Sequence, residues 1–186
     1  MKLEAILAPT YIQMLGALSA WLGKAAEQLP EADALLSKRL ADDMFPLATQ
    51  VRFSCVQALE GMCRLRGEAF PPLVNELLNE GRAASEHPGT IAEARTRIEQ
   101  VIAEVRKLAE DVPADDEDRS LEHALPMGIV FDLTAEQYAR DWALGQFYFH
   151  IMIAYAILRA AGVDLGKADY VAHMFQYVRP GTMPTA

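Results

Sequence analysis

Four stretches of the sequence repeat apolar residues at alternating spacings of three and four, which is the pattern of a helix with one buried face. The four stripes run from Leu7 to Ala25, from Leu47 to Leu65, from Ile91 to Leu108 and from Trp142 to Leu158. A chain of 186 residues has the length of about one domain, so the helices must bury these faces against one another. The sequence therefore predicts an all-α four-helix bundle, a single domain over residues 1–186 whose tail, residues 170–186, packs loosely.

Local signals indicate where these helices begin. Thr90 and Glu93 have the spacing of a capping box, in which each side chain satisfies a backbone donor of the first turn. Thr134 and Gln137 repeat this spacing before the last long helix. The second helix is expected to begin near Pro46, because a proline is tolerated in the first turn, where its missing N–H would have no partner in any case.

The connections between the helices are predicted to differ in kind. Residues 68–89 contain a Pro-Pro pair and are expected to form a connection with no more than two short helical turns. Residues 119–133 alternate weakly around a Met-Gly pair, which predicts a short hairpin before the last long helix. The acidic run at 115–118 is expected to be a solvated loop. The last long helix is apolar almost all round, so we expect it to be the central, most buried helix.

Charge excludes several classes of partner. The chain has 17 Lys and Arg against 26 Asp and Glu, a net charge of −9. A protein that binds nucleic acid or an anionic membrane surface needs a basic face to neutralise phosphates. We therefore expect neither nucleic acid nor a membrane as a partner.

The cysteines and the apolar runs favour a cytoplasmic protein. Cys55 and Cys63 lie eight residues apart on one predicted helix, about 12 Å, which is too far for a disulfide. Two unbridged thiols fit a reducing compartment. The most apolar run, Ile151 to Leu158, is much shorter than the ~20 residues of a membrane-spanning helix.

Few residues suggest chemistry. The sequence contains no P-loop, no glycine-rich dinucleotide turn, no nucleophile elbow and no HExxH zinc motif. His87 and His123 are expected at the surface, in a loop and in the hairpin, and His173 near the C-terminus is uninformative. His150 differs, because it lies in the middle of the last helix among apolar residues.

A buried imidazole needs a hydrogen-bond partner on at least one nitrogen. Gln146 lies one turn before His150 on the same face, and Gln50 on the second helix lies beside the apolar stripe. One interpretation is a core histidine held by two amides. The other is a polar pocket inside the bundle that holds, or once held, a metal, because bundle-core metal sites are built from side chains on facing helices.

Three strings give the chain a resemblance to a known family: Asp42-Asp43-Met44-Phe45-Pro46-Leu47 with Gln50, Phe147-Tyr148-Phe149-His150, and Ile157-Leu158-Arg159 with Gly162-Val163, Gly166-Lys167 and Asp169-Tyr170. They resemble an uncharacterised domain-of-unknown-function family of the DinB/YfiT-like superfamily, whose members are classed as metalloenzymes. The likeness spans about residues 4–171. It implies a DinB-like bundle with up-down-down-up connectivity, commonly a dimer.

The superfamily includes thiol-dependent S-transferases and a maleylpyruvate isomerase, whose metal is held by three histidines. By this resemblance His150 matches the second histidine of the last-helix pair, Gln146 matches the first, and Gln50 matches the histidine of the second helix. Gln57 is an alternative for that last position. Neutral amide oxygens suit magnesium or calcium better than zinc or nickel, and this set carries no negative charge. Asp43 could supply one, but its place before Pro46 suits a helix cap better.

We therefore expect no cofactor and no tightly bound metal. The leading hypothesis is a non-catalytic, cytoplasmic, homodimeric DinB-like bundle with a small polar pocket around Gln50, Gln146 and His150 that is open to a small-molecule ligand. The alternative is a metal- or thiol-dependent transferase or isomerase acting on a small molecule. There His150 would be a ligand or a general base, since its ordinary pKa of about 6.5 suits proton transfer near neutrality.

Overall fold

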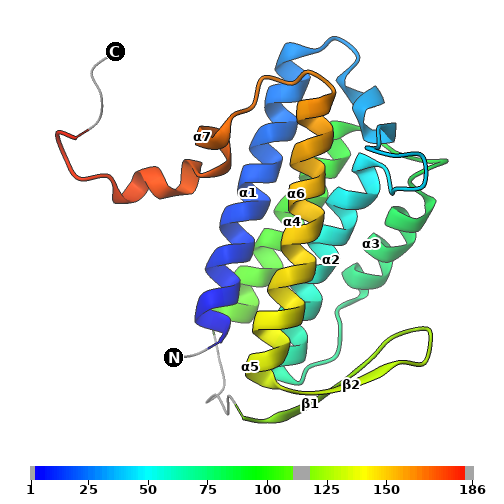
Figure 1. Cartoon of the computed structure of the whole chain (residues 1–186), viewed down its shortest axis with the longest axis vertical. Helices are drawn as coiled ribbons and strands as arrows, with labels where there is room; N and C mark the ends of the chain where they lie inside the picture. Colours follow the sequence, from blue (N-terminus) through cyan, green and yellow to red (C-terminus); the bar gives the residue numbers. More distant parts are fainter. Residues whose placement is uncertain (1–2, 111–117, 183–186) are drawn as a thin grey trace.

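Four long helices form the body of the protein, in a computed structural model that describes residues 3–110 and 118–182 (Figure 1). They are α1 (Glu4–Gln28), α2 (Leu47–Arg66), α4 (Ile91–Glu110) and α6 (Leu144–Ala160). Figure 1 shows α1 and α6 running in one direction and α2 and α4 in the other. In chain order the helices therefore run up, down, down, up, as the DinB-like resemblance predicts.

Helix α2 is the centre of the bundle. It contacts α1, α3, α4 and α6, and most of its residues are buried. The expectation that the last helix would be the most buried is wrong. Helix α6 packs on α1 and α2 through one face and leaves Phe149 and Met152 at 55% and 41% exposure on another. Composition alone cannot detect this, because apolar residues all round a helix do not say how many neighbours cover it.

The predicted helix starts are confirmed by hydrogen bonds. The amide of Glu93 donates to the Thr90 hydroxyl over 3.1 Å, and the amide of Thr90 donates to the Glu93 carboxylate over 2.8 Å. Thr134 and Gln137 form the second capping box. Helix α2 begins after Pro46, which carries no side-chain cap, so the predicted capping role of Asp43 is wrong.

The segment between α2 and α4 is more helical than expected. Residues Pro72–Ala83 form α3, a twelve-residue helix that packs on α2. The Pro-Pro pair begins this helix, since a proline fits the first helical turn. Thr49 donates a hydrogen bond to the carbonyl of Gly81 over 2.8 Å. A Cβ at Gly81 would lie 2.5 Å from the Phe53 ring, so only glycine permits this close approach of α3 to α2.

The predicted hairpin is present as an antiparallel pair, β1 (Ser120–Ala124) and β2 (Val130–Thr134). Gly128 turns it with a φ of +87°, a conformation that favours glycine. The chain continues through α5 (Ala135–Gln137) and a π-helical turn (Tyr138–Ala143) into α6. His123 on β1 is 3% exposed, so its predicted place at the surface is wrong.

The remaining elements lie at the edges of the bundle. They are a 3₁₀ turn, η1 (Ala32–Ser37), and, in the tail, α7 (Lys167–Tyr170) and η3 (Ala172–Tyr177). The tail is attached at its start, where the Trp21 indole donates to the Asp169 carbonyl over 3.2 Å and Lys24 pairs with the Asp169 carboxylate. Beyond this point the side chains of η3 are mostly exposed. The predicted loose packing of the tail stays a prediction. Most of the acidic run at 115–118 lies outside the described residues.

Two helical segments, Ala5–Gln28 and Ala135–Ala160, are long and apolar enough to cross a membrane by length and composition alone. In this structure 56% and 39% of their most apolar windows are buried inside the protein. Core helices of a bundle pass the same test, so this finding is weak evidence. The expected absence of a membrane partner stays a prediction.

Candidate functional site

The candidate site is a pair of polar side chains that face each other between α2 and α6. His150 Nδ1 lies 2.8 Å from Gln50 Oε1. Gln50 is 2% exposed and His150 is 8% exposed. The sequence places these residues 100 positions apart, and the antiparallel packing of the two helices brings them together. The predicted contact between the second and last helices is therefore present.

The orientation of the Gln50 amide follows from its second contact. Its Nε2 donates to the backbone carbonyl of Phe45 over 3.3 Å. This carbonyl precedes Pro46 and the first turn of α2, so it is not used by the helix. Because the amide nitrogen is the donor to Phe45, the oxygen must face His150 and accept. His150 then carries its proton on Nδ1 and leaves a lone pair on Nε2.

Burial keeps this imidazole neutral. Desolvation lowers the pKa of His150 from 6.5 to about 4, because the charged form loses its hydration. Aromatic rings surround it, with the centroids of Phe149 and Phe53 at 5.3 Å and 5.6 Å from that of the imidazole. The site therefore offers a neutral hydrogen-bond acceptor at neutral pH. The imidazole is a weak base, since its pKa lies well below neutral pH.

The residues at this site do not match the three-histidine ligand set that the resemblance implies. The Gln50 oxygen already accepts a hydrogen bond from His150 Nδ1, so the lone pair on His150 Nε2 is the strong metal ligand that remains in this pair. Gln146 is half-buried one turn before His150, and its side chain has no hydrogen bond to any part of the chain that the structure describes. Asp43 is exposed, and the alternative Gln57 is half-buried. Within residues 3–110 and 118–182 no three His, Cys, Asp or Glu side chains form a metal-binding group.

The two thiols are unsuited to nucleophilic chemistry. Burial raises the pKa of Cys55 to about 12 and that of Cys63 to about 11. A thiolate is the reactive form, and at neutral pH very little of either residue ionises. Both cysteines are free. They are small core residues of α2, as their place beside its apolar stripe indicates.

Sequence reasoning missed two features of this region. The Phe45 carbonyl fixes the Gln50 amide, and a carbonyl just before a proline-initiated helix was the available signal. Arg52, two residues after Gln50, is 5% exposed, and an arginine between buried positions of an apolar stripe was a signal as well. Long charged side chains are rarely fully buried without a partner.

Comparison with known proteins identifies a family for the sequence and a solved structure with a similar fold. A family model described as "Domain of unknown function (DUF1993)" matches residues 3–171. The chain is similar to a DinB family member protein from Shewanella denitrificans, known from a crystal structure, with a TM-score of 0.70 and 28% sequence identity. The likeness covers 99% of this chain and 100% of that one. No curated protein matches the sequence. The resemblance carried by the three sequence strings is thus confirmed.

Proposed function

We infer that this chain, which belongs to the DUF1993 family, is a non-catalytic DinB-like bundle protein that lacks the three-histidine metal centre of the superfamily. The observation that carries this proposal is the chain of hydrogen bonds from His150 through Gln50 to the Phe45 carbonyl. It uses the Gln50 oxygen to orient an imidazole. A neutral imidazole with one amide neighbour lacks the charge and the ligand number that hold zinc or nickel.

In this proposal the pair serves two purposes. It gives the buried polar atoms of His150 and Gln50 hydrogen-bond partners, since burying them unpaired would lower the free energy of unfolding. It also keeps His150 Nε2 available as an acceptor for a small molecule that carries a hydrogen-bond donor. The free, buried thiols of α2 support a reducing, cytoplasmic location.

The exposed outer face of α6 supports a homodimer. Phe149 and Met152 are exposed there, and Phe45, which packs against Phe53 beside His150, is 55% exposed. An exposed apolar strip on a helix of a bundle marks an interaction surface, and a two-fold dimer would cover the same strip on both copies. We expect Phe149→Glu to shift the protein towards monomer in sedimentation-velocity analysis. Phe175→Glu, at a residue of similar exposure in η3, should leave the proportion of dimer unchanged.

The test of the proposed function is the metal content of protein made without a histidine tag. It is measured by plasma mass spectrometry before and after dialysis against zinc, nickel and manganese. We expect well under one metal per chain, unchanged by His150→Ala. Near-stoichiometric metal that disappears in His150→Ala would contradict the proposal and support the alternative transferase or isomerase, to be screened with small thiols and electrophiles.

A restored site gives the matched positive control. Gln50→His combined with Gln146→His would place three histidines at the positions that the resemblance assigns to the ligands. We expect this double variant to gain zinc or nickel under the same dialysis. If the double variant binds metal and the original chain does not, the two glutamines are the reason why the original chain binds no metal.

A further inference from the structure

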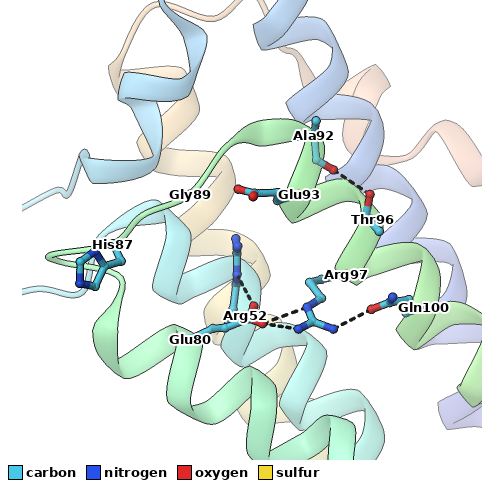
Figure 2. Close-up of a pocket in the computed structure, with 9 residues that line it drawn as sticks. All are labelled: Arg52, Glu80, His87, Gly89, Ala92, Glu93, Thr96, Arg97 and Gln100. Carbon is cyan, nitrogen blue, oxygen red and sulfur yellow. Dashed lines mark hydrogen bonds and ion pairs between the residues drawn. The ribbon is translucent and has the colours of Figure 1, made fainter.

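A second polar region lies on another side of α2. It is a surface pocket of about 500 Å³ between α2, α3 and the first turns of α4 (Figure 2). Its lining includes Arg52 from α2, Glu80 from α3, and Thr96 and Arg97 from α4. Residues two positions apart on a helix point about 200° apart, so Arg52 and Gln50 face different sides of α2. The pocket is therefore separate from the Gln50–His150 pair.

Arg52 is buried in this pocket with unused donors. Its side chain is 7% exposed, and its hydrogen bond from Nε to the Glu80 carboxylate is long at 3.4 Å. Its Nη1 is buried and has no hydrogen-bond partner within the described part of the chain. Figure 2 shows the guanidinium group extending into the pocket towards Gly89 and Glu93. A buried guanidinium with free donors is costly unless an acceptor reaches it.

The other charged groups of the pocket already have partners. Arg97 binds Glu80 through Nε at 3.0 Å and through a second, shorter contact, and it donates to Gln100 over 2.9 Å. The Glu93 carboxylate accepts from the amide and the hydroxyl of Thr90 in the capping box. Among the arginines and glutamates of the pocket, Arg52 therefore remains as the group with a buried donor that the described residues leave unpaired.

We propose that this pocket binds a small organic monocarboxylate, with the carboxylate held by the terminal nitrogens of Arg52. A planar carboxylate matches the fork of a guanidinium and forms charge-assisted hydrogen bonds with it. The two arginines of the pocket face Glu80 and Glu93, and Arg97 also pairs with Glu76 over 3.2 Å. A singly charged ligand suits this environment better than a phosphate dianion, which these carboxylates would repel more strongly.

Gly89 contributes room for such a ligand. It has a φ of +74°, which favours glycine, and a Cβ there would lie 2.9 Å from the Glu93 carboxylate and 3.4 Å from Arg52 Nη2. A side chain at this position would crowd Arg52 Nη2. The glycine that turns the chain into α4 thus also leaves space beside Arg52 Nη2.

The test is titration of the ¹⁵N-labelled full chain with sodium benzoate and, separately, with benzamide and inorganic phosphate, followed by NMR through the arginine Nε–H signals. We expect benzoate to shift the Arg52 signal in a saturable manner and benzamide to leave it in place. An equal response to benzamide, no response to benzoate, or tighter binding of phosphate would each overturn the proposal.

Variants separate binding from folding. Arg52→Lys keeps a positive charge and removes the fork, and it should weaken benzoate binding by about tenfold, the scale of one charge-assisted hydrogen bond. Thr96→Leu narrows the pocket without touching Arg52 and should weaken binding even if the Arg52 variant folds poorly. Thr10→Leu is its matched control, since Thr10 and Thr96 each donate to the carbonyl four residues earlier in their helices. Unchanged affinity in Thr96→Leu would contradict the assignment of the pocket.

Discussion

The protein buries two histidines, His150 and His123, and treats them in opposite ways. His150 lies between two helices and donates a hydrogen bond from Nδ1 to the Gln50 amide oxygen. His123, on the hairpin, is packed against the rings of Trp142, Tyr138 and Phe131 at centroid distances of 4.4, 5.5 and 6.4 Å. Both of its ring nitrogens are buried without a partner in the described chain.

The difference shows that burial alone does not make a polar site. Desolvation lowers the pKa of both residues, so each is held neutral. A facing helix supplies His150 with an amide of fixed orientation. The aromatic residues around His123 supply ring contacts and no acceptor for its nitrogens, so His123 fills space as an aromatic side chain would. The following predictions test this contrast, from the largest expected effect to the smallest.

The pH dependence of stability should reveal His150 first. Its pKa is about 4 in the folded chain against an ordinary value of 6.5, so between these values the unfolded chain binds more protons. Stability is therefore fully present above about pH 6.5 and is lost as the pH falls towards 4, by up to about 3 kcal/mol. Urea unfolding at a series of pH values measures this loss.

His150→Gln is the control for that experiment, because an amide can still bond to Gln50 but does not titrate. The acid-dependent loss should shrink in this variant. His123 contributes in the same direction, and His123→Phe separates its share. A pH profile that His150→Gln leaves unaltered would show that other groups cause the acid sensitivity.

Gln50→Leu should have the next largest effect. It removes the acceptor of His150 Nδ1 and leaves a buried donor unpaired, which costs about 2 kcal/mol of unfolding free energy. Gln50→Leu combined with His150→Leu replaces both partners by apolar groups and should restore much of that loss. A double-mutant cycle by urea unfolding at pH 7 measures the coupling, and strictly additive losses would contradict the role of the pair.

His123→Phe should have a smaller effect of the opposite sign. It removes two unpaired ring nitrogens from an aromatic environment and keeps a ring in place, so we expect a gain of about 1 kcal/mol, reduced by any overpacking. His150→Phe, the matched substitution at the other histidine, should destabilise because it leaves the Gln50 oxygen without its donor. Both changes in unfolding free energy are measured by thermal or urea unfolding. Equal changes for His123→Phe and His150→Phe would contradict the difference between the two histidines.

Much of the fold could be predicted from local signals. Spacings of three and four marked the long helices, and the boxes at Thr90 and Thr134 marked the starts of α4 and α5. Helix α3 was underestimated, because the Pro-Pro pair signals both a loop and a helix start. What separates the two is the packing of Gly81 against Phe53, a contact between residues that are distant in the sequence.

The candidate site was predictable in part. A histidine among apolar residues on α6 needs a polar partner, and the sequence offered Gln50 as one candidate, with Gln146 beside it and Gln57 as an alternative on the second helix. Nothing local indicated that Gln146 would stay outside the pair, because one turn of a helix brings two side chains to one face but does not decide which of them reaches the neighbouring helix.

By itself, the sequence determined the four helices, through periodicity and caps, and it carried the resemblance to the family, through the residues of the three strings. Only the tertiary structure decided which histidine has a partner, which face of α6 stays exposed and that Arg52 opens into a pocket. Each of these depends on what the facing element places within a few ångströms. That distance is set by helix packing and not by position in the chain.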